Sequence, residues 1–569
     1  MGAVDEPVGR VIGTEDAFAL DFWVWVRPDD YLQLDDVVTV PLTLPDGRAV
    51  RLHGVVDTVR ARYEGARFDS DAEAASEQRL PVNIAHAAHV TVTRVEPEIF
   101  VAPEPGAPVH RSQGAQRDEA LYFDRMRADG TAFVAGCSRD GQPVYGNLEF
   151  LNGVRGAHMN ISGVSGVATK TSYALFLLYS LFHSDVLGAQ AANTKAIVFN
   201  VKGEDLLWLD KPNKKLDDDA RAKYAALELP VGPFQSVGIW SPVRREPGSG
   251  LVHSASTRAA GVTAYAWSLA DFCRQRMFGF LFAQGDNETS RLASAVRAVE
   301  RWLDDPRVIG GPDARGHLTF EPDGSSVRDF NDLALLIDTQ RDQAMPAETE
   351  GTRAALVRRL QDAQYTAGHL VRAMTAEEQQ RHTVRILDGQ DAGENRQVSV
   401  IDINDLHDRA KRFVVGAVVR KLVEQKEGRA QPLVFLVLDE LNKYAPREGW
   451  SPIKEVILDI AERGRSLGVI LIGAQQTASE VERRVTANAS FRVAGRLDAA
   501  EASRGEYGFL TDAAKARASI LKPGTMFLHQ PEIPVPLLTQ FPFPAWATRR
   551  DEVDDAAERA GATLRGKRD

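Results

Sequence analysis

Short apolar runs that alternate with helical segments constrain the fold of this chain more than any other feature. The runs are KAIVFNV (195–201), VSVIDI (398–403), PLVFLVLDE (432–440), GVILIGAQQ (468–476) and FRVAGRL (491–497). Continuous apolar runs of this length are typical of strands that are buried on both faces. Helices are predicted between them, across residues 409–425 and around 452–466. Strands joined by crossover helices predict an α/β fold with a mainly parallel sheet, whose ligand binds at the carboxyl ends of the strands.

The rest of the chain divides around this sheet, and its 569 residues are enough for several structural units. Residues 1–110 show closely spaced β patterns without intervening helices, which predicts a small β-barrel. Residues 102–116 are rich in proline, glycine and alanine, which is typical of a linker. We then expect the first part of the core over 111–202, a mostly helical insertion over 203–395, the second part of the core over 396–547 and a charged tail over 548–569.

The composition excludes several classes of protein. Hydrophobic residues make up 44% of the chain and charged residues 26%, which excludes fibrous and largely disordered classes. The two cysteines, Cys137 and Cys273, predict neither a disulfide framework nor a zinc module. The chain shows no leader pattern and no membrane-spanning run, so we expect a cytoplasmic protein. Because the net charge is −11, any contact with DNA should be local, in a groove or a pore.

A glycine-containing loop follows the predicted strand that ends near Ile161. A phosphate-binding loop reads G-x-x-x-x-G-K-[ST], and here the lysine and threonine arrive one residue late, without a glycine directly before the lysine. The candidate nucleotide-binding residues are Gly163, Val164, Ser165, Gly166, Val167, Ala168, Thr169, Lys170, Thr171 and Ser172. Lys170 could reach the β and γ phosphates and Thr171 a magnesium ion. The alternative is a strand–loop–helix turn that binds nothing.

The run LVFLVLDE predicts a buried strand that delivers two carboxylates at its carboxyl end. Asp439 could hold a hydrated Mg²⁺ ion, and Glu440 could polarise an attacking water. The alternative is a strand that merely ends in an acidic turn. Together with the loop, the acidic pair favours a nucleotide site.

Two further elements follow in the order that an ATP site needs. Gln475 and Gln476 end a predicted strand, where an amide could sense the γ phosphate or orient water. Arg463 and Arg465 lie on the preceding helix, from which an arginine could reach the phosphate of a neighbouring subunit. The alternative for the arginines is a solvated basic face at a helix C-terminus.

Together these elements resemble the HerA-type ATPases of bacteria and archaea, in the HerA and FtsK branch of the P-loop motors. The resemblance is carried by GRVIGTEDAFALDFWVWV, GVSGVATKTS, IVFNVKGEDLLWLD, VSVIDINDL, FLVLDELNKYAP, AERGRSLGVILIGAQQT and FRVAGRL. It covers most of the chain and implies a RecA-like core with a helical insertion, preceded by a HAS-like β-barrel. It is weakest at the loop, where the family pattern is GxxGxGK[ST].

The resemblance also implies an activity and partners. Members of this family form hexameric rings that use ATP and Mg²⁺ to translocate double-stranded DNA through a central pore. They work with nucleases, and bacterial relatives serve in phage defence with nucleases or sirtuin-like NADases. The resemblance assigns phosphate binding to Lys170 and Thr171, Mg²⁺ to Thr171 and Asp439, and the catalytic base to Glu440. It assigns the sensor to Gln475 or Gln476 and the residue acting across the subunit interface to Arg463 or Arg465.

Two other activities share this core. One is a ring scaffold that binds nucleotide and activates a defence effector with little turnover, and the other is an ATP-driven protein remodeller. For a DNA translocase, basic residues near the strand ends are candidate DNA contacts, although each could be an ordinary surface residue. These are Lys202, Lys211, Lys214, Lys215, Arg447 and Lys454.

Overall fold

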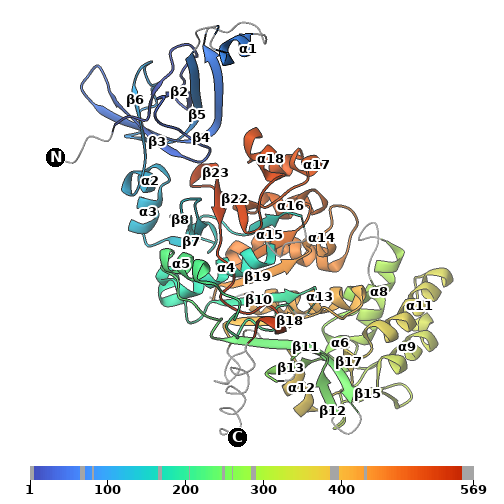
Figure 1. The fold of residues 1–569 in the computed structure, drawn as a ribbon. Coiled ribbons are helices and arrows are strands. Elements are labelled where there is room, and N and C mark those ends of the chain that lie inside the picture. The colour runs from blue at the N-terminus through green and yellow to red at the C-terminus, as the bar shows by residue number, and fades with distance from the viewer. Residues whose placement is uncertain are drawn as a thin grey trace. The chain divides into compact units, whose positions relative to one another are not determined.

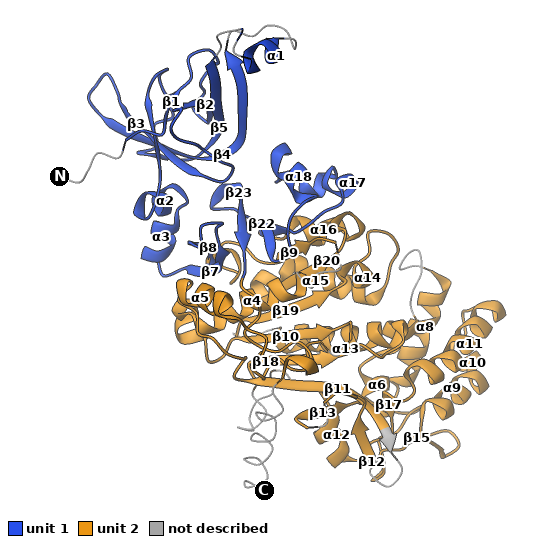
Figure 2. Ribbon diagram, viewed as in Figure 1, with its two compact units in different colours: residues 1–148, 491–541 blue, residues 149–490, 542–569 orange. Residues whose placement is uncertain are grey.

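The computed structural model describes residues 6–64, 71–77, 79, 83–164, 170–203, 205–246, 250–258, 260–282, 290–384, 387, 396–427 and 432–553. The chain forms two compact units, which Figure 2 colours separately. Unit 1 contains residues 1–148 and 491–541, and unit 2 contains residues 149–490 and 542–569.

A closed antiparallel barrel begins unit 1, as the β patterns predict. Its strand order is β1 (Gly9–Val11), β2 (Asp21–Val26), β5 (Asn83–Glu96), β4 (Ala49–Glu64), β3 (Val37–Thr43) and β6 (Pro108–Arg111). Alternate side chains fill its interior, among them Val24, Val38 and Val90, which are fully buried. The short helix α1 (Asp71–Ser76) lies between β4 and β5 in the sequence. The linker prediction for 102–116 is wrong over β6, because this strand pairs with both β1 and β3 and closes the barrel.

The remainder of unit 1 contains neighbouring sheet strands in the order β21, β22, β23, β7, β8. Its strands are β7 (Ala132–Cys137), β8 (Pro143–Asn147), β21 (Phe491–Ala494), β22 (Thr525–Gln530) and β23 (Ile533–Gln540), and its helices are α2 (Ala115–Ala120), α3 (Phe123–Ala128), α17 (Ala499–Ala502) and α18 (Asp512–Ala518). The run FRVAGRL begins with β21, which pairs antiparallel with β22, and β22 in turn pairs antiparallel with β23.

Unit 2 holds the parallel sheet that the apolar runs predict. Its order is β12, β11, β18, β10, β19, β20, β9, with β13 also beside β11 (Figure 1 labels β10 to β13, β18 and β19, and Figure 2 also labels β9 and β20). The pairings from β11 through β9 are all parallel. Every residue of β9 (Met159–Ser162), β10 (Lys195–Asn200), β18 (Val398–Asp402) and β20 (Val469–Gln475) is buried. The predicted α/β fold class with an N-terminal barrel is therefore confirmed.

Helices cover this sheet and position the residues at its carboxyl edge. α4 (Lys170–His183) and α15 (Pro452–Leu467) pack against β20, and α13 (Asp408–Lys426) packs against α15. α15 begins at an N-cap serine followed by proline and ends at Gly468, whose φ of 67° lets the chain turn directly into β20. β19 (Val434–Asp439) leads into the short helix α14 (Leu441–Tyr444), and α16 (Arg483–Ala487) follows β20.

The predicted insertion is mixed rather than mostly helical. The run VGIWSPV lies inside it and forms part of β11 (Val237–Glu246), which joins the core sheet parallel to β18. Its other strands are β12 (Gly250–His253), β13 (Val262–Tyr265), β14 (Trp267–Ser268), β15 (Leu318–Phe320), β16 (Ser325–Val327) and β17 (Val371–Arg372). Its helices are α5 (Asp218–Ala226), α6 (Leu269–Arg274), α7 (Phe278–Phe282), α8 (Arg291–Leu303), α9 (Phe330–Thr339), α10 (Arg341–Ala344), α11 (Glu350–Ala367) and α12 (Ala376–His382). Within the described parts of the chain, no helix is both long and apolar enough to cross a membrane.

Candidate functional site

The strand β9 and the helix α4 place the predicted loop at the carboxyl edge of the sheet. Lys170 is the first residue of α4 and is 6% exposed, and its Nζ donates a hydrogen bond to the carbonyl of Gly163 at 2.8 Å. Burial lowers the pKa of Lys170, while the charge of Asp439 acts against that change. The first-turn amides of a helix favour an anion, and the first turn of α4 carries no acidic residue. The loop positions Ser165, Gly166, Val167, Ala168 and Thr169 lie outside the described residues.

A hydrogen bond joins the start of α4 to the acidic end of β19. The hydroxyl of Thr171 donates to Oδ2 of Asp439 at 3.0 Å, and Oδ1 of Asp439 accepts from the backbone N–H of Glu440 at 2.8 Å. A hydroxyl and a carboxylate are oxygen donors that Mg²⁺ prefers. The residues therefore fit a magnesium–nucleotide complex, with Thr171 and Asp439 as the metal-binding pair and Lys170 beside them.

Glu440 adopts a left-handed backbone conformation, with φ 56° and ψ 43°. This conformation costs a residue with a side chain about 1 kcal/mol or more, and such strain is concentrated at functional sites. It turns the chain sharply from β19 into α14, so that the carboxylate projects at the edge of the sheet beside Asp439.

Two lysines hold the Glu440 carboxylate. Nζ of Lys202 lies 2.8 Å from one oxygen and Nζ of Lys443 lies 2.7 Å from the other, and the Glu440 side chain is only 13% exposed. Burial by itself would raise the pKa of this carboxylate, but the hydrogen bonds from the two lysines outweigh it and the pKa is lowered. Glu440 is therefore an ionised carboxylate that two ammonium groups engage.

The strand β20 brings Gln475 between the loop and the acidic pair. β20 lies between β9 and β19, and Gln475 is directly opposite Ser162. The Gln475 side chain is fully buried, and its Nε2 donates to Oδ1 of Asn160 at 2.7 Å. Its Oε1 is buried and has no hydrogen-bond partner among the described residues. Gln476 is exposed, so of the two predicted glutamines Gln475 is the one buried between β9, which leads into the loop, and the acidic strand β19, and its sensor role stays a prediction.

The structure does not bring Arg463 and Arg465 to this site. Both lie in the last turns of α15, which ends at Gly468. The Gly468 carbonyl accepts a hydrogen bond from the N–H of Val434, the first residue of β19. This end of α15 therefore lies at the amino edge of the sheet, opposite the candidate site. Arg463 forms ion pairs with Asp459 and Glu427, and Arg465 donates to the carbonyls of the 153–154 turn. Their role as arginine fingers remains a prediction that requires a second subunit.

One of the predicted DNA contacts is wrong. Lys454 is 6% exposed, and its Nζ lies 2.9 Å from a carboxylate oxygen of Glu482. The buried ammonium group of Lys454 pairs with a partly buried carboxylate and is not available to a phosphate backbone. Lys202 faces Glu440, as described above, and Lys215 is half exposed beside Asp551.

A cavity of about 290 Å³ adjoins Lys170, Thr171 and Asp439. Its wall includes residues that the sequence pattern missed, namely Thr548 and Arg549 from the C-terminal segment. Lys443 and Asn160 were also missed. Lys443 could have been found, because it lies three residues after Glu440 on the next helix, but nothing in the sequence links residues 548–549 to the loop.

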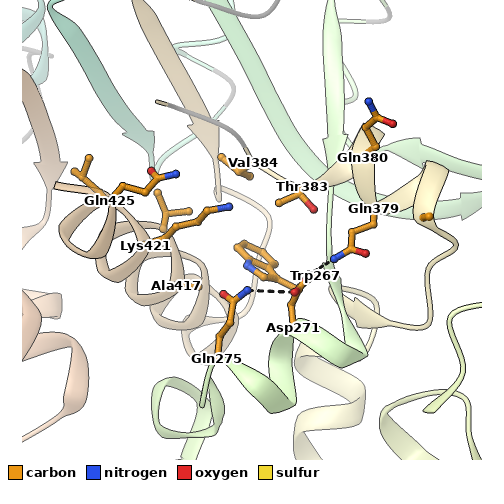
Figure 3. Close-up of a pocket in the computed structure, with 13 residues that line it drawn as sticks. Trp267, Asp271, Gln275, Gln379, Gln380, Thr383, Val384, Ala417, Lys421 and Gln425 are labelled. Atoms are coloured by element: carbon orange, nitrogen blue, oxygen red, sulfur yellow. Dashed lines mark hydrogen bonds between the residues drawn. The ribbon is translucent and has the colours of Figure 1, made fainter. Parts of the chain in front are cut away.

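A larger cavity of about 480 Å³ lies elsewhere in unit 2, between α6, α12 and α13 (Figure 3). Trp267 and Lys421 line it, and the side-chain amides of Gln275 and Gln379 point to Asp271 and donate to it at 3.2 and 2.5 Å. Asp271 is the single carboxylate of this lining, and it is already engaged by two amides. Lys421 and Thr383 also line this cavity, but its one carboxylate is held by two amides, whereas in the 290 Å³ cavity Asp439 lies beside Lys170 and accepts from the hydroxyl of Thr171.

Comparisons with known proteins find similarity only among solved structures. No family model matches the chain, and no curated protein matches its sequence. VirB4 of Thermoanaerobacter pseudethanolicus is 17% identical over 73% of this chain and 96% of its own, with a TM-score of 0.43. The unbound bacterial conjugative coupling protein TrwB is 13% identical over 75% of this chain and 94% of its own, with a TM-score of 0.43. The genome packaging NTPase B204 of Sulfolobus turreted icosahedral virus 2, in complex with ATP-gammaS, is 15% identical over 26% of this chain and 68% of its own, with a TM-score of 0.21.

Proposed function

We propose that this protein is a Mg²⁺-dependent ATPase of the P-loop motor type that translocates double-stranded DNA. The observation that carries the proposal is the 3.0 Å hydrogen bond between Thr171 and Asp439, which joins the helix after the loop to the acidic strand. Lys170 directly precedes Thr171 in the chain, and Glu440 directly follows Asp439. A buried ammonium, a metal-binding oxygen pair and a neighbouring carboxylate are the groups that phosphoryl transfer to water requires.

Each residue has a separate task in this mechanism. Bound Mg²⁺ would neutralise charge on the β and γ phosphates. Lys170 donates to the same oxygens from a buried position, where its charge is poorly screened. Glu440 accepts the proton of the attacking water once its carboxylate is released from Lys202 and Lys443. Gln475 offers its buried Oε1 as an acceptor that can orient this water, while Asn160 holds the amide in place.

The DNA, ring and partner parts of the proposal come from the resemblance to HerA-type ATPases. We infer a cytoplasmic homo-hexamer with double-stranded DNA in its pore and with helicase or translocase activity. We also infer an effector partner, a nuclease or a sirtuin-like NADase, in DNA processing or antiviral defence. In such a ring, Arg463 or Arg465 of one subunit would reach the phosphates of its neighbour.

Hydrolysis with and without duplex DNA tests the proposal. We expect duplex DNA to stimulate Mg²⁺-dependent ATP hydrolysis, and we expect the stimulation to decline as salt increases, because duplex binding depends on phosphate contacts. Native mass measured with and without nucleotide checks the ring. A protein that hydrolyses no ATP in the presence of Mg²⁺ and duplex DNA would not be a stand-alone motor.

A second function is supported by the two ion pairs of Glu440. A catalytic base held by two ammonium groups is suited to a ring that binds nucleotide with little turnover and activates an effector. In that case Lys170→Ala would change assembly or effector activity, while basal hydrolysis of the wild-type protein would already be near background. The same substitution in a motor would abolish a substantial DNA-stimulated rate.

A further inference from the structure

The C-terminal segment 542–553 is anchored beside α4, next to the candidate nucleotide site. Trp546 is fully buried, and its ring lies 4.9 Å from that of Tyr179 on α4 and 5.0 Å from that of Phe234. Nδ2 of Asn213 donates to the Pro544 carbonyl at 3.2 Å, and the Ala547 N–H donates to the Lys211 carbonyl at 2.8 Å. The position of the backbone at residues 547–549 is therefore set by packing within the protein.

This anchored segment delivers an arginine to the wall of the 290 Å³ cavity. Arg549 lines the cavity together with Lys170, Thr171 and Asp439. Its Nε lies 3.3 Å from a carboxylate oxygen of Asp205, and its side chain is 58% exposed. An exposed ion pair of this kind is weak, so a phosphate oxygen can replace the aspartate at little cost. The guanidinium group has a planar set of donors that matches phosphate better than an ammonium group does.

We propose that Arg549 binds the polyphosphate of the nucleotide, within the same chain that supplies Lys170, and that Asp205 holds its side chain at the cavity wall when no nucleotide is bound. This inference rests on the proposed function. It assigns a ligand-binding role to a part of the chain that is far in sequence from the loop and the acidic strand. Lys170 and Arg549 would then contact the phosphates from two separate elements, α4 and the C-terminal segment.

The neighbouring arginine provides a matched control. The guanidinium of Arg550 lies over the ring of Trp208, 5.4 Å from its centre, and Arg550 is not part of the cavity wall. Arg549→Gln and Arg550→Gln remove the same charge at adjacent positions. A general effect of lost positive charge would therefore alter both variants equally.

Equilibrium binding of a fluorescent, non-hydrolysable ATP analogue with Mg²⁺ tests the proposal on the full-length protein. We expect Arg549→Gln to weaken binding about tenfold, which is typical of a lost hydrogen bond between charged groups, and Arg550→Gln to change it less than about twofold. Thermal unfolding of Arg549→Gln without nucleotide should match that of the wild-type protein, because Arg549 is exposed. Equal affinities of the wild-type protein and Arg549→Gln would overturn the inference and leave the proposed function intact. A wild-type protein that binds no analogue would overturn both.

Asp205→Asn tests whether Arg549 exchanges its ion pair with Asp205 for a contact with the phosphates, or whether the charge of Asp205 acts on the phosphates directly. We expect this substitution to strengthen analogue binding a few-fold in the wild-type protein, because Arg549 no longer has to leave an ion pair. In the Arg549→Gln background it should have no effect, since the two residues then share no interaction. An equal gain in both backgrounds would show that Asp205 acts on the phosphates by itself, which contradicts the exchange.

Discussion

Removing both lysines that engage Glu440 should raise basal ATP hydrolysis. The perturbation is the double substitution Lys202→Gln with Lys443→Gln, which leaves the Glu440 carboxylate, Asp439 and Lys170 unchanged. In the nucleotide-free structure the lysine nitrogens lie 2.8 and 2.7 Å from the two carboxylate oxygens. For Glu440 to accept a proton from water, at least one of these contacts must be broken.

The size of the effect follows from the exposure of the lysines. Unit charges about 4 Å apart attract by about 4 kcal/mol at an effective dielectric of about 20. The side chains of Lys202 and Lys443 are 51% and 47% exposed, so water screens most of this attraction. Exposed ion pairs stabilise by about 0.2 to 1 kcal/mol each, and the low exposure of Glu440 favours the upper end of this range. Breaking both ion pairs therefore costs about 1 to 2 kcal/mol. This free energy corresponds to a rate about 5- to 30-fold higher when both are removed.

The assay is steady-state ATP hydrolysis with Mg²⁺, measured without DNA across a range of pH. Besides the faster rate, the acid limb of the pH–rate profile should move to higher pH, because burial then raises the pKa of Glu440 without opposition from the lysines. Lys215→Gln is the matched control, since Lys215 is 48% exposed and pairs with Asp551 instead of Glu440. An unchanged or slower basal rate in the double variant would refute the view that these lysines restrain the base.

Three further predictions concern separate parts of the molecule. Gln475→Ala should lower turnover at least tenfold with little change in nucleotide affinity, whereas Gln476→Ala should have a small effect on turnover, because Gln475 is buried beside the site and Gln476 is exposed. Steady-state kinetics on both variants checks this. Gly464→Ala should destabilise the protein by about 1 to 3 kcal/mol in denaturant unfolding, because the added Cβ would lie 2.4 Å from a backbone oxygen. The hydrogen bond that His89 donates to Asp57 raises the pKa of His89, so their interaction stabilises the barrel fully below pH about 6.5 and is lost as pH rises through the raised pKa. Relative to His89→Asn, the wild-type protein should therefore lose thermal stability on going from pH 6 to pH 8.

The parallel core could be predicted from the sequence because its strands are buried on both faces. Burial on both faces favours nearly continuous apolar runs, and that pattern marks β10, β18, β19 and β20 without any tertiary information. The acidic pair could be predicted for the same reason, because Asp439 and Glu440 stand at the end of such an apolar run. By contrast, β11 was missed because VGIWSPV contains proline and leads into a charged stretch, which is not typical of a core strand.

The electrostatics of the site could not be predicted, because they depend on residues that only the fold brings together. Lys202 follows β10 and Glu440 follows β19, and their ion pair exists because these two parallel strands end at the same edge. Arg549 reaches the cavity only through the packing of Trp546 against α4, a contact with no periodic signature in the sequence. The arginines of α15 were placed correctly on a helix, but the sequence pattern did not reveal that this end of the helix lies at the opposite edge of the sheet.

The most direct test of the proposed ATPase site is a comparison of nucleotide binding and turnover in the wild-type protein, Lys170→Ala and Glu440→Gln. Binding is measured with a non-hydrolysable ATP analogue and turnover by phosphate release, both with Mg²⁺ and duplex DNA present. We predict that Lys170→Ala loses binding, and that Glu440→Gln binds within about threefold of the wild-type affinity but hydrolyses at least 100-fold more slowly, because only the base is removed. A Glu440→Gln variant that hydrolyses ATP at the wild-type rate would contradict the assignment of the catalytic base and, with it, the proposed site.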